Sequence, residues 1–252
     1  MSVFAPSGSQ NKIIAAAGKA GVPYIMPNAW GCDVGNKKLV EEAGLGNIFE
    51  GVKAVEDTGV SSWIAMCSSF WYEYSLALGP RWYGFDIPNK KATFFGDGQV
   101  RINSSTWDQC GRAIAQFLSL KELPDDENDT SPTVSQWKNK SLYISSFLVS
   151  QRDMLDSLNR VQGTTDADWT IEHEPCEERY ARGKKMMEAG DRSGFSICLY
   201  TRVFYPNGGG NFQEKYTLAN DILQLPKEDL DTCTRKAITM AGNGWNPFAR
   251  VQ

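Results

Sequence analysis

The sequence predicts an α/β protein in which a parallel sheet is followed by a smaller mixed α/β domain. Two observations carry this prediction. Short apolar segments alternate with helical segments over about the first 80 residues, which is typical of a parallel sheet with helical crossovers. After Gly79 the pattern changes to a hairpin-like segment followed by helices and short strands. The 252 residues are 41% hydrophobic, which is enough for a substantial core.

The first part is predicted to contain three strands separated by two helices. Residues 2–6 (SVFAP) form a short apolar strand, and Ser9 is the candidate N-cap of the helix that follows. The second strand spans residues 22–27. A helix over 47–58 carries its apolar side chains on one stripe, and residues 60–72 form a buried strand that runs into a loop.

The second part is predicted from turn and capping signals. Residues 85–103 alternate around Gly96-Asp97-Gly98, which predicts a hairpin. Residues 105–120 form a capped amphipathic helix, and a polar surface loop follows over 121–140. The remaining predicted elements are a strand over 141–147, a helix over 150–163 with Ser150 as N-cap, a strand over 168–174 and a last helix over 226–241.

Charge and cysteine content exclude several classes of function. The formal net charge is −4 with acids and bases mixed along the chain, which argues against a nucleic-acid partner. No run of 18 apolar residues is present, so no membrane-spanning helix is expected, and the start has no apolar segment of a secretory signal. The six cysteines form no CxxC pair and His173 is the one histidine, which argues against a metal site. We expect reduced thiols and a cytoplasmic location.

Four stretches of the chain resemble the fungal NmrA-like, isoflavone-reductase-type proteins, and in particular the CipA-like oxidoreductases. The stretches are "VFAPSGSQNKIIAAAGKAGVPYIMPNAWGCD", "TGVSSWIAMCSSFWYEYSLALG", "KKATFFGDGQVRINSSTWDQCGRAIAQFLSL" and "SLYISSFLVSQRDMLDSLNRVQGTTDADW". The resemblance implies an atypical short-chain dehydrogenase that binds NADPH or NADH and a small-molecule substrate. It further implies that residues 1–80 are the C-terminal half of a Rossmann domain and that residues 81–252 form the substrate domain.

The dinucleotide fingerprint of such proteins is not found in this sequence. No GxGxxG or GxxGxxG motif is present, and none of the Gly-rich stretches lies between a strand and a helix. By resemblance, Val3–Ala5 matches the end of the family's fourth strand, so the Rossmann-type sheet is expected to be partial, with its first βαβ units lost or encoded upstream. The phosphate-binding loop belongs to those units. Strand Val3–Ala5 would then be an exposed edge, and we expect self-association through it.

Two turns are expected to line the nicotinamide side of the site. They are Pro6-Ser7-Gly8 and Pro27-Asn28-Ala29, and each follows a short apolar strand. Ligands in open α/β sheets bind beyond the carboxyl ends of the strands, in agreement with the resemblance. The alternative is that these residues only form turns.

Aromatic residues are expected to enclose the substrate. Phe70, Trp71 and Tyr74 follow the last strand of the first part, and Trp30 is the expected opposite wall. The alternative is a hydrophobic joint between the two domains.

The catalytic residues are the least defined part of the site. The single Tyr-xxx-Lys spacing, Tyr180 to Lys184, lies in a charged helix far from the first strands and is interpreted as coincidence. Isoflavone-reductase relatives place a lysine near the start of the helix over 47–58, where this sequence has Asn47-Ile48. Tyr72 is therefore the first candidate acid and Lys53 the second.

Two functions remain open. The first is an NAD(P)H-dependent reductase of a small aromatic or enone-type secondary metabolite. The second is a cofactor-free, degenerate member of the family that binds a ligand or regulates a partner.

Overall fold

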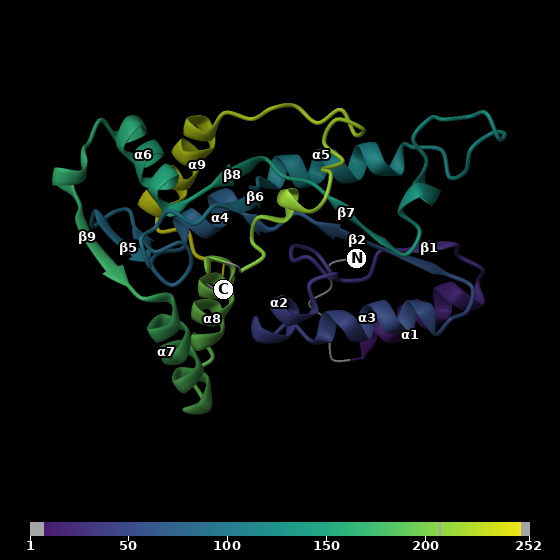
Figure 1. Ribbon diagram of the computed structural model, residues 1–252, viewed down its shortest axis with the longest axis horizontal. Helices are drawn as coiled ribbons and strands as arrows, with labels where there is room; N and C mark the ends of the chain where they lie inside the picture. The colour runs from purple at the N-terminus through teal and green to yellow at the C-terminus, as the bar shows by residue number, and fades with distance from the viewer. Residues whose placement is uncertain (1–7, 207, 248–252) are drawn as a thin grey trace.

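A three-stranded parallel sheet forms the centre of the first part of the chain. The computed structural model describes residues 8–206 and 208–247, and Figure 1 shows the arrangement of its elements. The sheet has the order β1 (Tyr24–Ile25), β2 (Ser62–Cys67) and β7 (Lys140–Tyr143). Both pairings are parallel. The predicted α/β class with a Rossmann-type parallel sheet is confirmed.

Helices cover both faces of this sheet (Figure 1). On one face lie α1 (Ser9–Lys19), α2 (Lys37–Glu42) and α3 (Asn47–Glu56), and on the other lies α5 (Trp107–Leu118). The alternation of β2 explains the two layers: Ile64 and Met66 pack in one hydrophobic cluster with Phe117 of α5, while Ala65 packs in another with Ile48 of α3.

Two further sheets organise the rest of the chain. One has the order β3 (Phe70–Trp71), β6 (Ile102–Ser105) and β8 (Phe147–Val149); the other has the order β4 (Phe85–Asp86), β5 (Lys91–Phe95) and β9 (Thr170–Glu174). The helices that surround them are α4 (Tyr72–Ala77), α6 (Gln151–Gln162), α7 (Cys176–Glu188), α8 (Gly194–Val203) and α9 (Leu230–Gly242). Helices α7 and α8 form a pair that extends away from the sheets (Figure 1). Short 3-10 turns lie at Val134–Trp137, Asp166–Asp168 and Phe212–Glu214.

Local capping signals predicted several helix ends correctly. Ser150 caps α6 through a capping box with Asp153, and Gly163 ends that helix with φ +67°. The Thr106 side chain caps α5 by accepting the Gln109 N–H. At α1 the prediction of Ser9 as N-cap is wrong: Gly8 occupies the N-cap position, no side chain caps the helix, and Ser9 is the first helical residue.

Several elements differ from the sequence predictions. The predicted hairpin around Gly96-Asp97-Gly98 is wrong: β5, before these glycines, pairs with β4 and β9, whereas β6, after them, pairs with β3 and β8. The last helix begins at Leu230 rather than Pro226, because the Asp229 side chain accepts the Thr232 N–H and sets the start. Helix α2 was not predicted; it is a single short segment with few apolar positions.

The division near residue 80 stays a prediction. Strand β7 comes from beyond it and completes the sheet of β1 and β2, so the two parts are intertwined. The predicted edge strand Val3–Ala5 lies outside the described residues. The self-association expected from it stays a prediction. Within the described ranges, no helix combines the length and apolar character needed to cross a bilayer.

Candidate functional site

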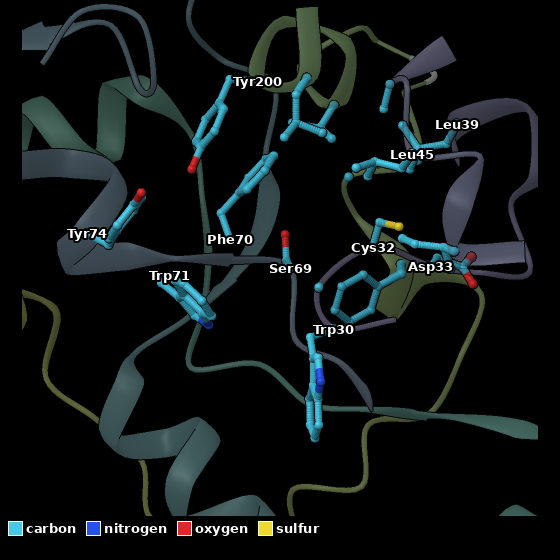
Figure 2. A pocket seen from close by; sticks show the side chains of 18 residues that line it. Trp30, Cys32, Asp33, Leu39, Leu45, Ser69, Phe70, Trp71, Tyr74 and Tyr200 are labelled. Carbon is cyan, nitrogen blue, oxygen red and sulfur yellow. The ribbon is translucent and has the colours of Figure 1, made fainter. Parts of the chain in front are cut away.

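A pocket of about 230 Å³ opens beyond the carboxyl ends of β1 and β2 (Figure 2). The loop after β1 contributes Trp30 through Asp33, and the segment after β2 contributes Ser69 through Trp71. Helices α2, α3, α4 and α8 close the remaining sides. The other lining residues are Leu39, Ala43, Leu45, Ile48, Tyr74, Leu199, Tyr200, Val203, Gly209, Gly210 and Phe212.

Backbone hydrogen bonds hold the two loops together at the base of the pocket. The Ser69 N–H donates to the Gly31 carbonyl at 2.8 Å, and the Gly31 N–H donates to the Met66 carbonyl at 3.2 Å. Gly31 has φ +107°, and a Cβ there would lie 3.3 Å from the Ser69 carbonyl oxygen. Glycine therefore allows the close approach of the two loops.

One wall of the pocket is aromatic. The rings of Phe70 and Tyr200 are stacked, with centroids 3.9 Å apart and planes 13° apart. The Tyr200 hydroxyl forms a 2.8 Å hydrogen bond with the Ser75 hydroxyl. At the rim, Trp71 meets Tyr74 edge-to-face at 5.7 Å. The wall thus offers flat apolar surface of the kind that packs against a ring compound.

Few polar groups reach the pocket. Burial, reinforced by the Asp33 carboxylate, raises the pKa of the Cys32 thiol to about 12, so Cys32 is a neutral thiol. The Asp33 carboxylate itself accepts the Tyr143 hydroxyl at 2.7 Å and the Gly35 N–H at 2.9 Å. Burial also raises the pKa of the Tyr74 phenol. No lysine or arginine is among the described residues that line the pocket.

Comparison with known proteins shows what this sequence and this fold are similar to. No protein-family model matches the chain. The sequence is 24% identical over 227 residues to the oxidoreductase aprR of Aspergillus flavus, which covers 88% of this chain and 70% of that protein. A crystal structure of isoflavone reductase matches with a TM-score of 0.65 at 18% identity, covering 91% of this chain and 71% of the other. The complex of leucoanthocyanidin reductase with NADPH from Vitis vinifera matches with a TM-score of 0.64 at 14% identity, covering 90% and 70%.

The resemblance to the NmrA-like, isoflavone-reductase-type oxidoreductases is confirmed. Because sequence identity to those chains is low, the structural likenesses establish the fold alone.

In this isoflavone-reductase-type fold, the four residues predicted to contact substrate lie together. Trp30, Phe70, Trp71 and Tyr74 all line the pocket. Figure 2 shows the Trp30 indole directed away from the central space, whereas Phe70 borders it. Their role in substrate binding stays a prediction.

The described members of the predicted nicotinamide side, Gly8 and Pro27-Asn28-Ala29, are not among the residues that line the pocket. Pro6 and Ser7 are outside the described residues. Gly8 is exposed with φ +82°, and no atom of the other described residues lies within 4 Å of the position a Cβ would take. Pro27 and Ala29 are buried, and the Asn28 N–H donates to the Gln10 side-chain oxygen at 2.6 Å.

The structure argues against catalysis by Tyr72. Its side chain is fully buried in the core, and its hydroxyl forms a 2.7 Å hydrogen bond with the Thr234 hydroxyl. Burial raises the pKa of Tyr72. The residue is not among those that line the pocket, because Tyr72 and Tyr74 are two residues apart on α4 and so point about 160° apart around the helix.

The position of Lys53 also argues against a catalytic role. Its ammonium group is exposed and pairs with Asp57 at 2.7 Å, which raises the pKa of the lysine. It lines a separate, open groove that includes Trp63 and Tyr143. By the resemblance stated above, the lysine of relatives matches Asn47-Ile48, and of these two residues Ile48 contributes an apolar side chain to the pocket. Tyr180 donates to the Glu42 carbonyl at 2.6 Å, in agreement with the interpretation of its spacing to Lys184 as coincidence.

Sequence reasoning missed several lining residues. Tyr200 and Val203 come from α8, and Phe212 follows it, more than 120 residues after the aromatic segment over 70–74. Nothing near them in the sequence signals a pocket. Ser69 had one signal, its place directly after a buried strand, but its backbone conformation could not be read from the sequence.

Proposed function

We propose that the protein is an NADPH- or NADH-dependent oxidoreductase that acts on a small, largely apolar ring compound, such as an aromatic or enone-type secondary metabolite. The observation that supports it most is the aromatic pocket at the carboxyl ends of two parallel strands. The sequence similarity to a protein named as an oxidoreductase supports the reaction class. We further propose a cytoplasmic location, since all six cysteines are free thiols.

In this proposal, Tyr74 is the proton donor, the role for which the sequence analysis named Tyr72 first. Its phenol lines the pocket and makes no hydrogen bond to another described residue. Because burial raises its pKa, the phenol stays protonated at neutral pH. A protonated phenol at this position can donate a hydrogen bond, and then a proton, to a substrate oxygen.

A nicotinamide cofactor supplies hydride when it is bound. The described residues provide only some of the groups that would hold such a molecule. No atom of the other described residues fills the space beside Gly8, but the Asn28 N–H already donates to the Gln10 side chain. The sequence has no glycine-rich turn between a strand and a helix that could bind the phosphates of the cofactor. Among the described residues that line the pocket, none has a cationic side chain. These residues therefore do not make a complete dinucleotide site.

A cofactor-free ligand-binding protein is the second candidate. The observation that favours it is Ile48, which places a branched alkyl group in the pocket; by resemblance, the lysine of relatives is expected at Asn47-Ile48. Such a pocket retains the shape needed to bind an apolar ligand without a group to assist reduction.

Cofactor binding distinguishes the two functions. We expect millimolar NADPH to raise the melting temperature and 1-tetralone, a bicyclic aryl ketone, to be reduced with loss of absorbance at 340 nm. Leu45→Trp fills the pocket and should abolish turnover, whereas Leu118→Trp, at a site 69% exposed, is the matched control. Binding of 1-tetralone without any effect of NADPH would instead favour the cofactor-free protein.

A further inference from the structure

We propose that Ser69 is the hydrogen-bond donor that selects and orients the ligand in this pocket, and that the ligand is a neutral ring compound with a carbonyl oxygen. The proposal rests on the proposed function only in placing a ligand in the pocket. It assigns a specificity residue that the sequence analysis did not identify.

The backbone of Ser69 has a conformation that serine adopts at a cost. Its φ is +57°, in the left-handed region where glycine and asparagine are favoured. The hydrogen bond from its N–H to the Gly31 carbonyl fixes this conformation at the base of the pocket. Strained residues held in this way cluster at ligand sites, so the side chain at this position calls for a function.

The Ser69 hydroxyl is free to serve a ligand. It makes no hydrogen bond to another residue of the described chain. Figure 2 shows the oxygen directed into the space between the side chains of Phe70 and Cys32. A glycine here would relieve the backbone but would remove this group.

The remaining lining defines the chemistry of the ligand. Around Ser69 the walls are apolar, with the stacked rings of Phe70 and Tyr200 on one side and Leu39 and Leu45 on the other. An anionic ligand is disfavoured for two reasons. The Asp33 carboxylate lies at the edge of the pocket, and the described lining residues include no lysine or arginine.

The size of the pocket sets the size of the ligand. An apolar protein cavity of about 150 Å³ holds a benzene molecule. The larger pocket of about 230 Å³ therefore suits a bicyclic ring system. An oxygen on that ring would accept from Ser69, because a buried hydroxyl without a partner is costly once water is excluded.

Two ring compounds that differ only in the carbonyl group test the assignment. We expect saturation-transfer NMR titrations to show that the protein binds 1-tetralone about fivefold to tenfold more tightly than tetralin. Ser69→Ala should remove that preference and leave tetralin affinity unchanged. Ser69→Gly should do the same and also raise the melting temperature.

Gln224→Gly is the matched control for the backbone. Gln224 also has a positive φ, +49°, but is exposed and does not line the pocket. It should raise the melting temperature and keep the preference for 1-tetralone.

An unchanged preference in Ser69→Ala, or no binding of either compound to the unmodified protein, overturns the proposal. Failure of the proposed oxidoreductase function gives a different result: NADPH has no effect, while the Ser69-dependent preference is intact and supports this assignment.

Discussion

Substituting Tyr72 by phenylalanine separates a structural tyrosine from a catalytic one. The substitution removes the hydroxyl that bonds Thr234 at 2.7 Å and keeps the ring that packs edge-to-face on Phe147 at 5.2 Å. Thr234 retains a second partner, because the Ser157 hydroxyl also lies 2.7 Å from its oxygen. The loss is therefore one net hydrogen bond, about 1 kcal/mol in the free energy of unfolding. For a chain of this length, that corresponds to about 2–4 °C in melting temperature.

Urea unfolding followed by tryptophan fluorescence measures the predicted loss, and binding of 1-tetralone should be unchanged. Tyr74→Phe is the counterpart: stability should change by less than about 0.5 kcal/mol, while turnover should fall. The reasoning is refuted if Tyr72→Phe abolishes turnover or binding while the free energy of unfolding stays the same.

Three further predictions address charge, thiol chemistry and backbone shape. Burial raises the pKa of the Glu73 carboxyl group, whose Oε1 accepts the Trp107 N–H while the buried Oε2 has no described partner. The folded state therefore holds the carboxyl proton more tightly than the unfolded state, and the free energy of unfolding falls as the pH rises above about 4.5. Glu73→Gln should flatten that part of a profile of melting temperature against pH. Cys32, with its pKa raised to about 12 from 9.0, should hold about a thousandfold less thiolate than a free thiol, and mass spectrometry of iodoacetamide-treated folded protein should find it unlabelled at pH 8. Gly84→Ala should destabilise the protein by roughly 3 kcal/mol or more in urea unfolding, because a Cβ at this φ of +88° would lie within 2.5 Å of the Thr93 carbonyl oxygen; near-native stability would contradict the described backbone.

The sequence was most informative where structure depends on neighbouring residues. Helix α6 could be placed from Ser150 to Gly163 because both caps lie in the same short segment. Strand β6 could not be placed in its sheet, since its partners β3 and β8 lie about 30 and 45 residues away in the chain and the glycines over 96–98 suggested a local partner instead.

The candidate site shows the same limit. The aromatic segment after β2 was identified because it follows a buried strand, but which tyrosine faces the pocket depends on α4 being a helix. A segment interpreted as a loop gave no basis for choosing Tyr74 over Tyr72. The stacked pair of Phe70 and Tyr200 joins residues 130 positions apart and depends on how α8 packs against β3.

A crystal structure of the protein with 1-tetralone tests the central claim, that this pocket binds a neutral ring ligand, most directly. We predict ligand density between Phe70 and Leu45, with the ketone oxygen about 2.8 Å from the Ser69 hydroxyl. Density at another site, with the pocket filled by rearranged side chains, would contradict the claim.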